Sequence, residues 1–271
     1  MKNKKRLAVI AAISTVITGL IVLLSTLFGQ TVMDSSKKGQ EEKAQQDTVS
    51  KMRSTFPVVD YLQADVQSVD RRAKSRKYGL ISVLDPNITD NSSVVIINEW
   101  EQSLTALPVE QSQVIVLGTV VGAHAYMSDN KQAVYSEFTI EIEKIFKNET
   151  GKHAGVNNTI FAERQGGIVR FPTGFEKWVF IEGQGMPALK KRYLFFLSYD
   201  SVGLEPQKSD LSILTAYEIS DGRLFPLDSP GGGSHPIATS YTGKPQESIF
   251  EDMDRSLKRK NKPAPKMVVQ P

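Results

Sequence analysis

The amino-acid sequence predicts a mainly β domain that follows a single transmembrane helix. Three observations carry this prediction. An uncharged apolar run lies near the N-terminus, short β-patterned segments follow one another between residues 111 and 227, and glycine- and proline-containing turns separate these segments. Several short strands at close spacing, without helical patterns between them, are typical of a β-sandwich or a barrel.

The composition of the chain argues against nucleic-acid binding and excludes sites that depend on cysteine. The chain has 271 residues, a net charge of +3 and no cysteine. The small net charge lacks the concentrated basic face of a nucleic-acid binder, so nucleic acid is not expected as a partner. Without cysteine there are no disulfides, no thiolate nucleophile and no thiolate zinc site. The chain therefore depends on a core of its own for stability.

The N-terminal segment predicts a membrane anchor. Residues 1–6 form a basic tail, and the apolar run begins at Leu7 and ends at Phe28. As a helix this run is ~33 Å long at 1.5 Å per residue, enough for a hydrocarbon core of ~30 Å. The basic residues before it place the N-terminus in the cytoplasm and the C-terminal domain in the periplasm or outside the cell. The lipid bilayer is thus the first expected partner.

A cleaved signal peptide is the alternative reading of this segment. Its apolar region would normally span about 7–15 residues before a site of small residues. The run here is longer, and the sequence after Phe28 is a poor cleavage site. The anchor is favoured, and cleavage stays open as the alternative.

Two segments connect the anchor to the barrel region. Residues 29–55 are polar and form a linker, and residues 56–110 form a helical or irregular lead-in. The lead-in contains a basic run, which consists of Arg71, Arg72, Lys74, Arg76 and Lys77. We interpret this run as solvated surface. The alternative is that it contacts anionic lipid head groups or a partner. Apolar residues at helical spacing before Pro108 predict a helix over residues 93–106. Because residues 94–97 are all Val or Ile, a short strand is the alternative there.

Residues 111–227 carry the predicted strands. The clearest is centred on Ile140, where Phe138, Ile140 and Ile142 alternate with polar residues. The alternation slips after residue 144, which predicts a bulge. Further strands are predicted at 114–121, 159–163, 168–171, 177–181, 193–198 and 212–219. Residues 228–271 are rich in Gly, Pro and Lys, and they predict a disordered tail that is dispensable for folding, with one short amphipathic helix over 246–257.

The order of these strands resembles a known architecture. The stretches V-I-V-L-G-T-V-V from Val114, F-T-I-E-I-E-K-I-F-K-N from Phe138, T-I-F-A-E from Thr159 and R-Y-L-F-F-L from Arg192 carry the resemblance. They are similar to the OB-like Greek-key barrel of netrin-like domains, which include tissue inhibitors of metalloproteinases. The stretch L-P-V-E-Q-S-Q-V-I-V-L-G-T-V from Leu107, together with G-Q-G-M-P from Gly183 to Pro187, resembles uncharacterised bacterial membrane-anchored proteins of the same strand pattern. The inhibitor function is not implied, because it resembles zinc chelation by an N-terminal cysteine, which this chain lacks.

The resemblance implies a binding role. OB barrels bind strands or sugars on a basic and aromatic face. The residues expected on such a face are Arg164, Arg170, Trp178 and Arg192. The alternative places the aromatic side chains in the core and the bases in solvent. The predicted function is a membrane-tethered, extracytoplasmic interaction module without catalytic activity or cofactor, and its partner is a protein or a saccharide.

A hydrolase is the alternative function. It would assemble its site from scattered polar residues, with His124, Asp129 and Glu163 as the candidates. The three histidines of the chain are widely separated, so no metal site is predicted. Neither a G-x-S-x-G nor a P-loop motif is present.

Overall fold

The fold is described from a computed structural model. The chain divides into residues 1–51 and a second compact unit, residues 52–271. The structure describes residues 55–63, 74–75, 77–78, 84, 94–97, 104–149, 155–199 and 211–260 of this second unit. The predicted anchor at residues 7–28 and the linker up to residue 54 lie outside the described residues. Within the described ranges, no helix combines the length and the apolar character that crossing a membrane would take.

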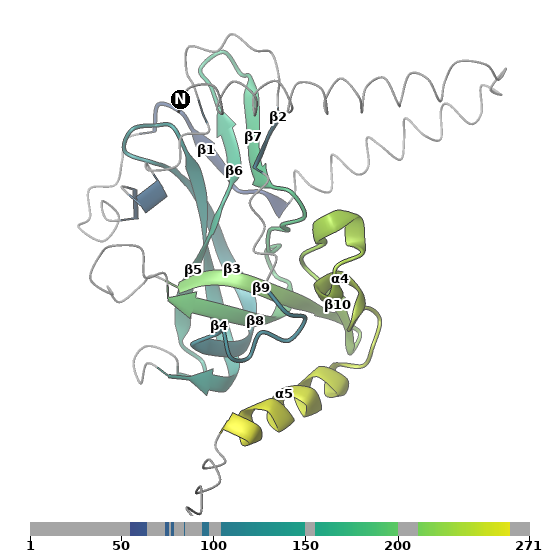
Figure 1. The fold of residues 1–271 in the computed structure, drawn as a ribbon. Coiled ribbons are helices and arrows are strands. Elements are labelled where there is room, and N and C mark those ends of the chain that lie inside the picture. The colour runs from purple at the N-terminus through teal and green to yellow at the C-terminus, as the bar shows by residue number, and fades with distance from the viewer. Residues whose placement is uncertain are drawn as a thin grey trace, which may run out of the picture. The chain divides into compact units, whose positions relative to one another are not determined.

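The predicted mainly β class is confirmed. In the described part of the chain, ten strands form two sheets, and two α-helices and one 3-10 helix follow the last strand (Figure 1). The larger sheet contains β3 (Val114–Met127), β4 (Val134–Asn148), β5 (Thr159–Gln165), β8 (Arg192–Tyr199), β9 (Leu211–Ser220) and β10 (Arg223–Pro226).

Five strands of the larger sheet close into a ring. β3 pairs with both β4 and β8, β4 pairs with β5, and β8 pairs with β9, all antiparallel. A short parallel pairing of β5 with β9 completes the ring, through Ala162 opposite Leu211 and Glu163 opposite Ser212. The later residues of β9 pair with β10 instead. The ring is therefore closed by its shortest ladder.

The smaller sheet has the order β1-β6-β7-β2, where β1 is Val58–Asp60, β6 is Gly167–Arg170, β7 is Glu176–Ile181 and β2 is Val94–Ile97. The predicted helix over 93–106 is wrong at residues 94–97, which form β2, and at residues 104–106, which are not helical. β2 pairs in parallel with β7. The β-branched side chains of β2 favour an extended backbone, and the free edge of β7 supplies the ladder for it.

The main core fills the inside of the ring. Phe138, Ile140 and Ile142 are all buried, and they lie among inward-facing residues of β3, β5, β8 and β9. The predicted bulge is present, since the β3–β4 register skips Phe146. A second shift occurs at Gly118, where an added Cβ would lie 2.5 Å from the carbonyl oxygen of Glu141. Glycine is required there by the close approach of β4.

We expect Ile140→Ala to lower the free energy of unfolding by ~2–5 kcal/mol, because it leaves a cavity in the ring interior. Glu141→Ala changes the exposed neighbour on the other side of β4 and is expected to cost well under ~1 kcal/mol. Urea unfolding of residues 52–271 measures both. Equal losses for the two variants would contradict the half-buried register of β4.

A second core lies on the outside of the ring, and it contains the C-terminal segment. The predicted disordered tail is wrong for residues 228–260. They form η1 (Pro230–Gly233), α4 (Pro236–Thr239) and α5 (Gln246–Lys260). Apolar side chains of this segment pack on outward residues of β3, β8 and β9; the segment contributes Ile237, Tyr241, Ile249 and Met253. The predicted amphipathic helix corresponds to α5, and the apolar side of α5 is what docks the tail.

Tyr217 of β9 connects two other segments within the second core. Its hydroxyl oxygen lies 2.7 Å from the carbonyl oxygen of Ala106, to which it donates, and 3.3 Å from that of Ile237, which can share the same hydrogen. Burial raises the pKa of Tyr217 above its ordinary range, and the neighbouring Tyr241 and Asp228 raise it further. In the main core, burial raises the pKa of Tyr193 to about 12. Both phenols therefore stay neutral well above the pH at which an exposed tyrosine ionises.

Candidate functional site

The structure does not bring the four residues predicted for binding onto one surface. Arg164 is buried, and Trp178 is half-buried against the main core, with its ring 5.9 Å from that of Phe56. Arg170 lies on β6 with its side chain 47% exposed and pairs with Glu176 at 3.2 Å. Arg192 lies on β8 and pairs with Glu143 at 2.7 Å. Arg170 and Trp178 lie in the smaller sheet, whereas Arg164 and Arg192 lie on β5 and β8 of the larger sheet.

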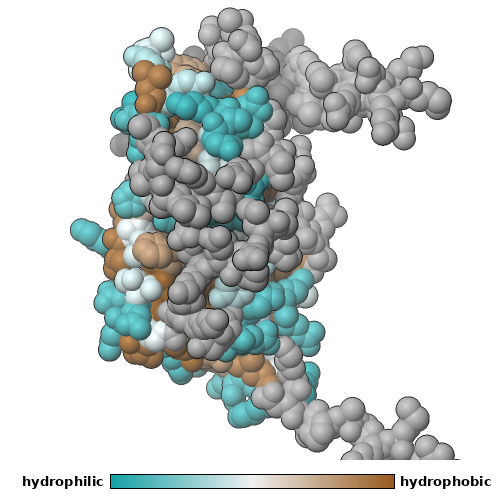
Figure 2. All heavy atoms as spheres, turned by 90° about the vertical axis from the view of Figure 1, so that its left-hand side faces the viewer, coloured by the Kyte–Doolittle hydropathy of each residue, from teal (hydrophilic) through white to brown (hydrophobic). Residues whose placement is uncertain are grey.

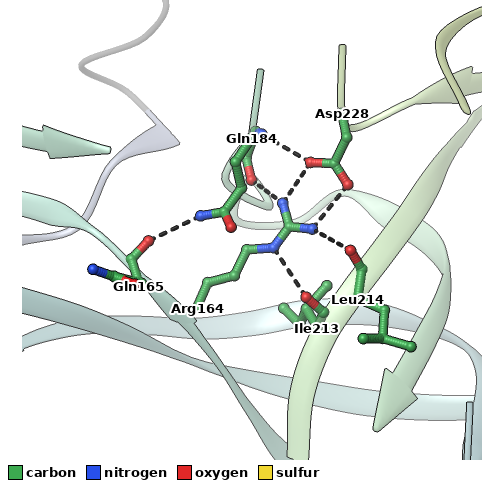
Figure 3. A network of polar contacts seen from close by, with 7 residues as sticks. Arg164, Gln165, Gln184, Ile213, Leu214 and Asp228 are labelled. Atoms are coloured by element: carbon green, nitrogen blue, oxygen red, sulfur yellow. Dashed lines mark hydrogen bonds and ion pairs between the residues drawn. The ribbon is translucent and has the colours of Figure 1, made fainter. Parts of the chain in front are cut away.

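Arg164 fixes the end of the ring instead of facing a ligand. Its Nη1 and Nη2 atoms donate to the two carboxylate oxygens of Asp228 at 2.6 and 2.8 Å (Figure 3). Its remaining donors go to the carbonyl oxygens of Ile213, Leu214 and Gly185. All five N–H donors of the guanidinium are therefore used inside the domain. The predicted binding role of Arg164 is incompatible with this burial.

The Arg164 contacts also reinforce the ring closure. The parallel ladder between β5 and β9 has only two residue pairs, ending at Glu163 and Ser212. Arg164 is the next residue of β5 after Glu163, and its side chain donates to the carbonyl oxygens of Ile213 and Leu214, the next two residues of β9. Asp228, which comes after β10, neutralises the guanidinium and also accepts a hydrogen bond from the backbone of Gly185 at 2.9 Å. One side chain thus joins β5, β9 and two loops.

The three residues of the hydrolase hypothesis are not brought together. Asp129 is exposed in the turn between β3 and β4 and accepts a hydrogen bond from the backbone of Asn130. His124 and Glu163 lie on β3 and β5, with β4 between them, so their backbones are two strand spacings or ~10 Å apart. Glu163 is buried and ion-paired. No reacting group can sit within hydrogen-bond reach of all three.

A different set of polar residues does converge on the outside of the ring. The register places His124 opposite Glu137, and Glu137 opposite Glu163. Two residues further along, Tyr126 lies opposite Tyr135. Directly paired residues of neighbouring strands point to the same side of a sheet, and the core residues of β4 point to the other side. We call this outward group the acidic face; it comprises His124, Tyr126, Tyr135, Glu137 and Glu163.

A basic helical segment of the lead-in covers the acidic face. Lys74 lies 2.7 Å from a carboxylate oxygen of Glu137, and Lys77 lies 2.5 Å from one of Glu163. The ring of Tyr78 stacks on that of Tyr135, with centroids 4.4 Å apart and an interplanar angle of 9°. We call the covering residues, which are Lys74, Ser75, Lys77 and Tyr78, the basic segment. The interpretation of Lys74 and Lys77 as solvated surface is wrong, since their side chains are only 5% and 15% exposed.

The sequence did not reveal the acidic face, because its residues form no local motif and are not close to one another along the chain. Glu137 and Glu163 lie on different strands, and only the β4–β5 register makes them neighbours. The paired lysines come from a segment with no strand pattern. The spacing of Lys74 and Lys77, three residues apart on one helical face, was the available signal.

The chemistry of this site is that of charge recognition. Two carboxylates directly opposite each other on paired strands repel, and positive charges on the segment above offset that repulsion. Among the residues that the structure describes, no three His, Asp or Glu side chains are arranged to hold a metal ion. On the face shown in Figure 2, the coloured hydrophobic and hydrophilic residues are interspersed.

Comparison with protein-family models, with curated proteins and with solved structures gives no match for this chain.

Proposed function

We propose that this chain is a membrane-tethered, extracytoplasmic interaction module, built on an OB-like barrel and without catalytic activity. The observation that carries the proposal is that the acidic face holds a separate basic segment through ion pairs and a ring stack. We infer that a surface with these contacts can also bind a basic peptide from another protein, through the same ion pairs and ring stack. The polar residues of the hydrolase hypothesis do not converge, so no observation favours that alternative.

The strand order supports the OB-like part of the proposal. In chain order, the first ring strand pairs with the second and fourth, and the third pairs with the fifth in parallel. A five-stranded Greek-key barrel of this kind is typical of OB folds, which bind their ligands on the face of the second and third strands. Here those strands are β4 and β5, which carry Glu137 and Glu163.

The tether is the second part of the proposal, and its support is the uncharged run from Leu7 to Phe28 with basic residues before it. We expect alkaline phosphatase fused to the C-terminus to be active, because that enzyme folds only outside the cytoplasm. A reporter that works only in the cytoplasm is expected to be inactive at the same position. The reverse pattern would overturn the topology.

Crosslinking in the native membrane tests the interaction itself. A photo-crosslinking amino acid at His124, which is exposed at the rim of the acidic face, is expected to give a discrete crosslinked product. The matched control is the same amino acid at Val156, which is 53% exposed before β5 and lies outside the acidic face. If neither position, nor others around the ring, gave a product, the interaction function would be wrong.

A further inference from the structure

The basic segment does not saturate the acidic face. Glu163 Oε1 receives a hydrogen bond from Lys77 at 2.5 Å. Its other oxygen, Oε2, is buried and accepts no hydrogen bond, and Lys74 Nζ, the nearest cation among the described residues, lies 3.5 Å away. Lys74 instead donates to Glu137. A buried carboxylate oxygen without a hydrogen bond is costly, so the site has one unfilled acceptor position.

An arginine would fill that position where a lysine does not. The guanidinium presents parallel N–H donors that bond a carboxylate in a fork, whereas an ammonium acts as a point charge. Both Glu137 Oε2, at 2.7 Å, and Glu163 Oε2, at 3.5 Å, lie near Lys74 Nζ, so a guanidinium at this position has two carboxylates to which its several N–H groups can donate. The acidic face is thus better matched to an arginine-bearing segment than to its present occupant.

The face also extends beyond its present occupant. Phe161 lies two residues before Glu163 on β5, on the same side, and is 44% exposed. Val121, in the β3 bulge beside Gly122, is 48% exposed. Between them Thr139 of β4 pairs with both Gly122 and Phe161. A longer ligand therefore finds apolar contacts next to the charged ones.

We propose that the acidic face is a recognition site for a basic segment of a partner protein, with an arginine at the position of Lys74, a lysine at that of Lys77 and a tyrosine at that of Tyr78. The chain's own basic segment occupies the site as a weaker internal ligand, and the partner binds by displacing it. This inference rests on the proposed interaction function and names the face and the partner chemistry.

The absence of cysteine in the chain provides a clean test. Ser75 is 5% exposed, and its Oγ is buried without a hydrogen bond, so Ser75→Cys places a single buried thiol within the basic segment at little structural cost. The full chain in detergent is labelled with a maleimide, and the labelling rate reports how often the segment leaves the face. Two synthetic peptides are added in turn: the sequence of residues 72–80, and the same sequence with arginine at position 74.

Both peptides are expected to speed labelling to a plateau, and the arginine peptide is expected to reach half-effect at a concentration at least fivefold lower. A scrambled peptide of equal charge should have no effect. In the Glu163→Gln background, the advantage of the arginine peptide should disappear. Equal half-effect concentrations for the two peptides, or an unchanged labelling rate with both, would overturn the proposal.

A second measurement covers the case in which Ser75→Cys does not fold. Fluorescein-labelled arginine peptide is titrated onto the Lys74→Ala/Lys77→Ala chain, and its anisotropy is expected to rise, with the rise lost when Glu137→Gln and Glu163→Gln are added. No rise would overturn the proposal. If the peptide did not bind but a crosslinked product formed at His124, the chain would still be an interaction module, but one that does not recognise an arginine-bearing segment. Failure of this inference can therefore be told apart from failure of the proposed function.

Discussion

Arg164→Met is expected to lower the free energy of unfolding by ~3–5 kcal/mol, because it leaves the carboxylate of Asp228 buried without a cation. The side chains of the pair are only 2% and 0% exposed. The substitution also removes the hydrogen bonds to Ile213 and Leu214 that extend the β5–β9 ladder. Urea unfolding of residues 52–271 measures the loss.

Two further variants separate the buried charge from the lost packing. Arg170→Met removes an exposed, ion-paired arginine and is expected to cost less than ~1 kcal/mol. Adding Asp228→Asn to Arg164→Met removes the unpaired charge, so part of the stability should return. If Arg164→Met were no more damaging than Arg170→Met, the pair would not hold the ring closed.

Truncation after Asp228 is expected to abolish stable folding. It leaves the Arg164 pair intact but removes the residues that cover the outside of β3, β8 and β9. Fully buried apolar side chains each contribute about 1.5–3 kcal/mol, and domains of this kind are stable by only about 5–15 kcal/mol in total. Circular dichroism and urea unfolding of chains 52–228 and 52–271 make the comparison.

Point variants on α5 provide the graded form of this test. Ile249→Ala, at a position with 0% exposure, is expected to cost ~2–5 kcal/mol. Glu251→Ala, on the exposed side of the same helix, should cost less than ~0.5 kcal/mol. A stable chain 52–228, or equal effects of the two point variants, would show that α5 does not contribute to the fold.

The sequence predicted strands correctly where the order of apolar and polar residues shows which side of the strand is buried. The alternation around Ile140 reports one buried side, and it identified β4 and its bulge correctly. The runs at 114–117 and 194–197 do not alternate, and such runs belong to strands that are buried on both sides. That pattern implied a cover outside the ring, and α4 and α5 provide it. The prediction of a disordered tail at residues 228–271 rested on composition, and it did not consider that the outer side of the ring needs an apolar cover.

The candidate site was less predictable, for a physical reason. Its contacts join segments far apart in the chain, such as Lys77 with Glu163 and Arg164 with Asp228. No local period encodes such pairs, and a charged residue read alone is most often solvated. Arg164 was expected on a surface for that reason. In the structure it lies at the end of the shortest ladder, where its side chain bonds β9 and Asp228 inside the domain.

The order of the ring strands along the chain has a kinetic consequence. β3, β4 and β5 are consecutive and pair as a meander, whereas the β3–β8 and β5–β9 pairings join strands separated by four and three others. Contacts of high sequence separation form late, since the entropy of loop closure is lost before they contribute. We therefore expect a transient form in which the meander exposes Phe138 and Ile140 beside an unpaired β5 edge. Such a form is prone to aggregation, and a chaperone that holds it until β8 and β9 pair would raise the yield of folded protein.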